Sequence, residues 1–135
     1  MIKAVIDTNV IVSAYINKDS PPAKILNKVF DGEILMYIDE RILDEYKRVL
    51  SYPKLKIGKK NVDFFTLYLE HNAEYSGSCA VIRDANVPDD DVIFLEVAMK
   101  AKVQYLITGN TKLFNFRNYA GCKIITPAEF IALLK

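Results

Sequence analysis

Short, almost wholly apolar runs alternate along the chain with longer segments whose apolar residues recur at helical spacing. The runs cover residues 2–6, 34–38, 79–82, 103–108 and 122–126. A strand that is apolar on both faces needs cover on both faces, which is typical of parallel sheets joined by helices. The pattern therefore predicts an α/β fold, a three-layer α/β/α sandwich with a mostly parallel central sheet.

Capping residues indicate where the intervening helices begin and end. Ser20 precedes two prolines and can cap a helix that Asp31-Gly32 ends, and Asp39 or Glu40 opens the next helix. Further helices are expected after the first strand through Tyr15, across Val62–Leu69, over 90–101 and from Pro127. Residues 17–22 and 51–60 are expected to be loops.

Length and composition limit the class of protein. A chain of 135 residues, 51% of them hydrophobic, predicts a single domain over 1–135 with one sizeable core. No apolar run approaches eighteen residues and no signal sequence is evident, so neither a membrane span nor secretion is expected. Cys79 and Cys122 fit no metal spacing and are expected to be reduced core residues of a cytoplasmic protein.

The charges are unevenly distributed. The net charge of +1 argues against a strongly basic nucleic-acid scaffold. Yet the stretch from Arg41 to Lys60 holds seven basic residues against two acidic ones, and the stretch from Asp84 to Glu96 holds five acidic residues and no basic one. Each stretch could also be an ordinary solvated surface.

Asp7 follows the first apolar run directly, in the sequence VIDTN. Ligands of open parallel sheets bind beyond the carboxyl ends of the strands, so the first strand delivers Asp7 to the edge where chemistry occurs. The Asp7 carboxylate can equally cap the helix that follows. The spacing leaves both roles open.

Helical periodicity places Glu45 beside the buried face of its helix. It lies about 40° outside the edge of the apolar arc, whereas Asp44 points nearly opposite the centre of that arc. The Glu45 side chain can therefore point inward over the edge of the sheet, and the Asp44 side chain is expected to be exposed to solvent. The alternative is an exposed Glu45 that pairs with Arg41 or Arg48 along the helix.

Asp89, Asp90 and Asp91 stand at the start of the helix expected over 90–101. Acidic residues in a first turn complement the helix dipole, which would explain them structurally. Asp91 falls within the apolar arc of this helix and Glu96 falls outside it. A carboxylate directed toward a core is costly unless a cation compensates it, and a divalent metal ion is one such cation.

Asp7, Glu45 and Asp91 together predict an oxygen-only cluster. Mg²⁺ and Mn²⁺ prefer carboxylates and water, and they leave positions open for phosphate oxygens. His71 is the only histidine and the cysteines are scattered, which argues against a zinc site. A metal ion bound there could make a nucleophile from water and neutralise charge on a phosphodiester.

Three blocks of the sequence resemble the PIN domain in their order and spacing: AVIDTNVIVSA, LDEYKRVLSYPKL and PDDDVIFLEVAMKAKVQYLITGN. In detail the chain is similar to the VapC-like ribonuclease toxins of toxin–antitoxin pairs. The resemblance covers nearly the whole chain. Its first and third blocks are specific, whereas the second is less so because a glutamate in a helix is common.

The resemblance carries the acidic residues of the family onto Asp7, Glu45 and Asp91. The associated polar residue falls on Asn9, and Asp90 is a neighbouring carboxylate that can assist in binding metal.

The family often has a fourth acid in the turn after the next strand, and this chain departs from that pattern. Its turn reads TGNTKLF, with Asn110 and Lys112 where carboxylates can occur. Asn110 and Thr108 can still orient water or substrate, and an asparagine there is compatible with a one-metal site.

The resemblance implies a Mg²⁺- or Mn²⁺-dependent endoribonuclease, a cognate antitoxin protein that blocks the site, and a homodimer or higher assembly. The expected mechanism has Asp7 and Asp91 binding the metal, while Glu45 completes the shell or positions the water that attacks a phosphodiester in line. Cleavage would leave a 5′ phosphate if the 3′ oxygen departs.

Other residues bear on how RNA would be held. The basic stretch from Lys47 to Lys60 could neutralise a phosphate backbone. Tyr15 and Tyr52 could stack on a base, or they could be ordinary partly buried tyrosines.

Two other classes of protein compete with the nuclease. A catalytically weak or inactive PIN-like module would bind RNA or a protein partner without turnover. The missing fourth acid is the sequence feature that favours this class. A phosphatase of the haloacid dehalogenase type needs a second aspartate where this chain has Asn9, and a receiver domain needs one at the end of a middle strand, where Asp39 is only close.

Overall fold

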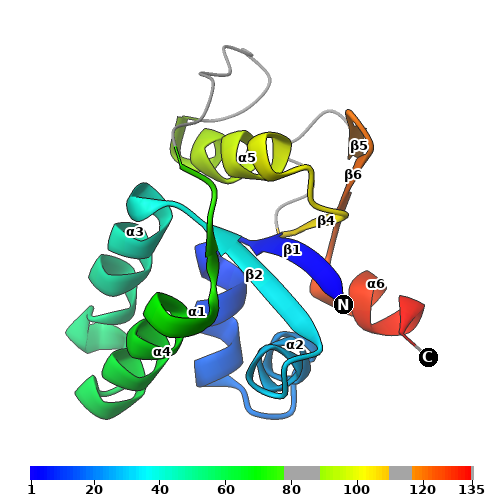
Figure 1. Ribbon diagram of the computed structural model, residues 1–135. Helices are drawn as coiled ribbons and strands as arrows, with labels where there is room; N and C mark the ends of the chain where they lie inside the picture. The colour runs from blue at the N-terminus through cyan, green and yellow to red at the C-terminus, as the bar shows by residue number, and fades with distance from the viewer. Residues whose placement is uncertain (78–88, 110–116, 135) are drawn as a thin grey trace.

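A computed structural model describes residues 1–77, 89–109 and 117–134, with the backbone alone for 89–91 (Figure 1). Its central element is one sheet of parallel strands with an antiparallel strand at one edge. The strands lie in the order β3-β2-β1-β4-β6-β5, and only the β5–β6 pair is antiparallel among the described strands. Their bounds are β1 (Ile2–Ile6), β2 (Ile34–Ile38), β3 (Glu74–Tyr75), β4 (Tyr105–Ile107), β5 (Asn118–Tyr119) and β6 (Cys122–Ile125).

Helices cover both faces of this sheet, so the predicted three-layer α/β/α sandwich is confirmed. In Figure 1, α5 crosses one face over β1, β2 and β4, while α2 and α6 lie on the other, and α3 and α4 run side by side beyond β2. The helices are α1 (Thr8–Ile16), α2 (Pro21–Phe30), α3 (Glu40–Leu50), α4 (Lys59–Asn72), α5 (Asp89–Ala101) and α6 (Pro127–Leu133).

The predicted helix boundaries are confirmed where local capping chemistry sets them. The Ser20 hydroxyl accepts from the Ala23 N–H before α2, and the Asp39 carboxylate accepts from the Ile42 N–H at the start of α3. Past the end of α2, Gly32 takes a positive φ of 83°, which suits glycine. Each of the two side-chain caps satisfies one N–H group that the first turn of its helix leaves without an intrahelical partner.

The core lies between the sheet and its two helical layers. Ala4, Val5 and Ile6 of β1 are fully buried, as the apolar run predicts. On the α3 side, the buried ring of Tyr46 packs against Phe65 of α4 and Phe94 of α5, with centroids 5.5 and 6.4 Å away. Burying each such side chain contributes about 1.5–3 kcal/mol, so this aromatic cluster fixes α3 against its neighbours.

The sequence pattern missed the edges of the sheet. The two-residue strands β3 and β5 carry no apolar run, because an edge strand is held by backbone bonds to one neighbour only. The strand expected over 79–82 lies outside the described residues, and β4 is shorter than the expected 103–108. The loop expected over 51–60 contains a short 3₁₀ helix, η1 (Pro53–Leu55). None of the described helices is both long and apolar enough for a membrane span.

Candidate active site

Asp7 stands directly after the carboxyl end of β1, at the predicted edge of the sheet, and its side chain also caps α1. Its side chain is 5% exposed. One carboxylate oxygen accepts from the Asn9 N–H at 3.4 Å, and the other accepts from the Thr108 hydroxyl at 2.8 Å. Thr108 follows β4, the strand beside β1, so the ends of two neighbouring strands meet at this carboxylate.

Burial raises the pKa of the Asp7 carboxyl above its ordinary value. The hydrogen bonds from Thr108 and from the Asn9 and Thr8 N–H groups oppose this effect and only partly offset it. A carboxylate that is desolvated in this way gains from a nearby cation, because the ionised form is the one that burial penalises. The position thus fits a ligand of a hard metal ion.

Glu45 is brought beside Asp7 by a contact that the sequence did not predict. The hydroxyl of the buried Thr8 donates to Glu45 Oε2, and the Glu45 side chain is 18% exposed. Glu45 therefore faces inward over the sheet edge, as expected, while Asp44 is exposed. The only sequence signal for Thr8 is its place directly after Asp7, at the first position of α1.

The alternative pairing of Glu45 is also present in part. Glu45 Oε1 lies 4.0 Å from Arg48, so one oxygen faces a surface cation while the other faces Thr8. Arg41, the other candidate partner, does not pair with Glu45 and turns instead toward Asp39 and Glu96.

Tyr46 locks α3 onto the end of β1. Its ring is fully buried and its hydroxyl donates to the Ile6 carbonyl, one residue before Asp7. Burial raises the pKa of the Tyr46 hydroxyl well above its ordinary value, and the negative charges of Asp7 and Glu45 raise it further. The Tyr46 hydroxyl thus ties the helix that carries Glu45 to the strand that ends before Asp7.

The remaining predicted site residues are placed only in part. Asn9 is exposed in the first turn of α1. Asp90 and Asp91 lie in the first turn of α5, and the orientation of their side chains lies outside what is described, as does all of Asn110. Among side chains that are described, no three histidine, cysteine or acidic residues form a metal-binding group. Asp7 and Glu45 thus remain two members of a predicted three-carboxylate cluster.

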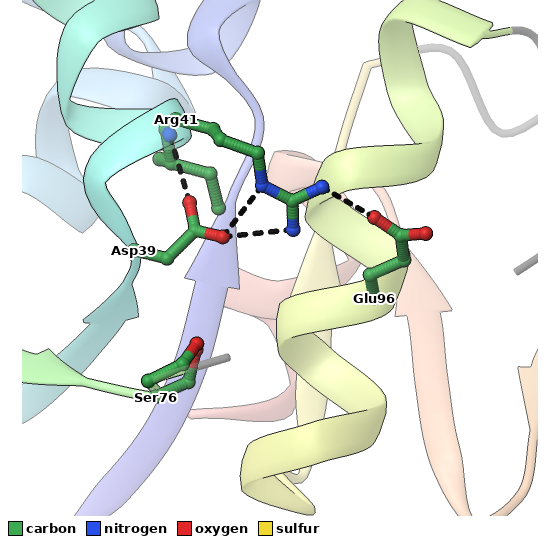
Figure 2. Close-up of polar contacts among 6 residues, drawn as sticks. Asp39, Arg41, Ser76 and Glu96 are labelled. Carbon is green, nitrogen blue, oxygen red and sulfur yellow. Dashed lines mark hydrogen bonds and ion pairs between the residues drawn. The ribbon is translucent and has the colours of Figure 1, made fainter. Parts of the chain in front are cut away.

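Glu96 corrects one detail of the periodicity argument. It was expected outside the apolar arc of its helix, yet its side chain is 4% exposed and its Oε1 lies 2.6 Å from Arg41 Nη1 (Figure 2). The helical arc was drawn from apolar residues alone. An acid can lie inside when a cation from another helix meets it.

The basic stretch is largely neutralised by local partners. Besides Arg41 and Arg48, Lys47 pairs with Glu70 at 3.2 Å and Lys59 with Asp63 at 2.6 Å. Three exposed lysines of the stretch form no ion pair with any described residue, namely Lys54, Lys56 and Lys60.

A pocket of about 520 Å³ lies between the end of α3, η1 and the start of α4, and its lining includes Tyr52 and, of these three lysines, Lys56. The Tyr52 hydroxyl accepts a hydrogen bond from Arg48 at 2.8 Å. Because Arg48 follows Glu45 by three residues on α3, this bond connects the pocket to the turn of the helix that carries Glu45. Tyr15 matches the alternative of an ordinary partly buried tyrosine. Its ring packs against Phe65, and burial raises the pKa of its hydroxyl to about 12.

Comparison with known proteins agrees with this architecture. The sequence profile of the PIN domain matches residues 3–112. The chain is 33% identical over 148 aligned positions to the uncharacterized protein MJ1680 of Methanocaldococcus jannaschii, covering 96% of this chain and 90% of that protein. Its fold is similar to a chain in the crystal structure of VapBC2 from Rickettsia felis bound to a DNA fragment from their promoter. That match has a TM-score of 0.59 and 14% identity, and it covers 93% of this chain and 98% of the other.

Proposed function

Because this chain belongs to the PIN domain family, we propose that it is a Mg²⁺- or Mn²⁺-dependent endoribonuclease, the toxin of a toxin–antitoxin pair. The observation that carries the proposal is the buried Asp7 carboxylate at the end of β1, with Glu45 held beside it through Thr8. Ligands of open parallel sheets bind beyond the carboxyl ends of the strands, and these two carboxylates are brought to that edge by different elements, β1 and α3.

The donor set fits a hard cation. Asp7 and Asp91, with Asp90 adjacent, are the proposed ligands. Oxygen donors are what Mg²⁺ and Mn²⁺ prefer, and burial makes the ionised Asp7 costly without a counter-charge. A metal ion bound there supplies an activated water and stabilises charge on the phosphodiester.

The chain's own residues have separate tasks in the proposed reaction. Thr108 holds one oxygen of Asp7 at 2.8 Å, which fixes the plane of that carboxylate. Thr8 orients Glu45 through its Oε2, so that Glu45 can position the attacking water or take its proton. Asn9 and Asn110 are proposed to orient substrate or water.

The substrate strand is proposed to run from Glu45 along α3 to the pocket at Tyr52. Arg48 lies between these points, and Lys54, Lys56 and Lys60 supply exposed positive charge beyond it. Positive charge without a local acidic partner attracts the phosphate backbone, independent of base sequence. A cognate antitoxin protein, a homodimer or higher assembly, and a cytoplasmic location complete the proposal.

The test is cleavage of a mixed single-stranded RNA by the purified protein with Mg²⁺, with Mn²⁺ and with EDTA. Asp7→Asn is compared with Asp44→Asn, which removes the same charge from an exposed position of α3. We expect metal-dependent cleavage that falls by about 100-fold in Asp7→Asn and persists in Asp44→Asn. If wild type and Asp7→Asn are equally inert while both bind RNA, the protein is instead a catalytically inactive binding module.

A further inference from the structure

Arg41 joins α3 to α5. Its Nη1 lies 2.6 Å from Glu96 Oε1, and its Nε and Nη2 each lie 2.8 Å from Asp39 Oδ2. Figure 2 shows the guanidinium spanning the space between the two helices. Three nitrogens of one planar group are thus engaged by two carboxylates, which fixes its orientation far better than a single contact would.

Both carboxylates that hold Arg41 are themselves fixed. The other oxygen of Asp39 accepts from the Ile42 N–H at 3.0 Å, as the cap of α3. The Glu96 side chain is 4% exposed and that of Asp39 11%, so both acids are largely desolvated. A carboxylate withdrawn from water to this degree depends on its cation, and here that cation comes from the neighbouring helix.

The pair lies close to the proposed site on both helices. Arg41 precedes Glu45 by four residues, about one turn of α3. Glu96 follows Asp91 by five residues on α5. Each helix is continuous between its two positions. A contact that fixes the turn of Arg41 therefore constrains the turn of Glu45, and a contact that fixes Glu96 constrains the turn of Asp91.

Two other hydrogen bonds of α3 reach β1 and α1, and the ring of Tyr46 also packs against Phe94 of α5. Thr8 holds Glu45, and the Tyr46 hydroxyl holds the Ile6 carbonyl. These two hydrogen bonds place Glu45 beside Asp7, but they do not connect α3 to α5. The Arg41–Glu96 contact is therefore the polar link between the helix of Glu45 and the helix of Asp91 among the described residues.

We propose that the Arg41–Glu96 pair positions α5 against α3 and so brings the acidic first turn of α5 to Asp7 and Glu45. The inference rests on the proposed function of the same site. In this proposal Arg41 acts through Asp39 and Glu96, which it contacts, so it is a positioning residue.

The test compares Arg41→Gln and Glu96→Gln with Glu70→Gln, which breaks the Lys47–Glu70 pair from the α4 side. The control removes an ion pair of the same helix that links α3 to α4 rather than to α5. Arg41→Lys is added because it keeps a positive charge for Glu96, which protects folding, while a single ammonium lacks the fork that spans both acids. Three quantities are measured on the full chain: Mn²⁺ affinity by titration calorimetry, kcat and KM for single-stranded RNA, and the thermal midpoint of unfolding.

We expect Mn²⁺ affinity and kcat to fall by about 10–100-fold in Arg41→Gln and Glu96→Gln, with KM unchanged. Arg41→Lys should fold and show an intermediate loss, and Glu70→Gln should match wild type. The double variant should be no worse than Arg41→Gln alone, because that variant already breaks the Arg41–Glu96 pair.

A purely stabilising role predicts a different result. In that case the variants lower the thermal midpoint while the folded protein binds Mn²⁺ and turns over RNA like wild type, and this outcome overturns the inference alone. If wild type itself neither binds Mn²⁺ nor cleaves RNA, the proposed function fails and the inference fails with it.

Discussion

The Thr8 hydroxyl donates a hydrogen bond to Glu45 Oε2, joining the first residue of α1 to the middle of α3. The two residues are 37 positions apart in the chain. Since Thr8 directly follows Asp7, this bond holds the second carboxylate at the edge of the sheet where the first one lies. Its role would be to orient Glu45, much as outer residues orient the ligands of metal sites.

Replacing Thr8 by valine should therefore impair catalysis without unfolding the protein. Valine keeps the shape of the side chain but removes the donor, so we expect kcat/KM for RNA to fall by about 10–100-fold. Thr8→Ser, which keeps the hydroxyl, should stay close to wild type. The control is Thr66→Val, since the Thr66 hydroxyl is also buried but donates to the Asp63 carbonyl in α4. Equal activity of Thr8→Val and wild type would contradict the orienting role.

Asp7→Asn should stabilise the metal-free protein at neutral pH. Burial raises the pKa of Asp7 in the folded state above the unfolded value of 3.8, so the folded protein holds this proton more tightly. Stability is then lost as pH rises through the interval between these two pKa values, and the ionised Asp7 opposes folding above it. Asparagine avoids that penalty, and the Thr108 hydroxyl can either donate to its oxygen or accept from its amide.

Urea unfolding in EDTA at pH 7.5 and pH 4.5 measures this effect. The gain in free energy of unfolding of Asp7→Asn over wild type should be larger at pH 7.5 than at pH 4.5. Asp44→Asn should show no such gain at either pH. A variant that is less stable than wild type at pH 7.5 would mean that the hydrogen bonds of Asp7 outweigh its desolvation.

Metal addition should reverse that order. If Asp7 is a ligand, Mn²⁺ binds the folded chain and stabilises it by about 2.7 kcal/mol when present at 100 times its dissociation constant. The thermal midpoint of wild type should rise with Mn²⁺ concentration, and that of Asp7→Asn should stay nearly constant. An equal rise in both would place the metal ion away from Asp7.

The fold could be predicted because its determinants are local. Apolar runs such as Ala4–Ile6 mark strands buried on both faces, and residues such as Ser20 and Asp39 cap helices through their immediate neighbours. Edge strands such as Glu74–Tyr75 could not be predicted, since two exposed residues carry no periodic signal.

The site was predictable to a lesser extent. The position of Asp7 follows from the end of a strand, and that of Glu45 from one helical arc. Thr8 and Glu96 were missed because their partners come from other helices, Glu45 of α3 and Arg41 of α3, and no spacing within one helix records such contacts. Asp91 remains a prediction.

Tyr46→Phe should lower the free energy of unfolding by about 1–3 kcal/mol. The Tyr46 hydroxyl bonds to the Ile6 carbonyl in a fully buried environment, and its removal withdraws a partner from that carbonyl. Urea unfolding monitored by circular dichroism measures the loss. Tyr68→Phe is the control, because Tyr68 makes a similar bond to the Val29 carbonyl at 2.7 Å but is only partly buried, so its loss should be smaller.

Removing the exposed lysines near the pocket should weaken RNA binding and leave the chemical step intact. The triple variant replaces Lys54, Lys56 and Lys60 by glutamine. If each lysine neutralises one phosphate of a single strand, the slope of log affinity against log salt should become shallower by about 2. Affinity is measured by fluorescence anisotropy of labelled single-stranded RNA in an Asp7→Asn background, which slows cleavage.

The control for this last prediction replaces three exposed lysines that lie elsewhere on the protein, Lys3, Lys24 and Lys123. It has the same net charge as the first triple variant, so any difference between the two reports position rather than total charge. We expect the control to keep most of the affinity and nearly the full salt slope. Equal losses in both variants would mean that RNA is held by the general field of the protein, and the strand would then have no defined path from Glu45 to Tyr52.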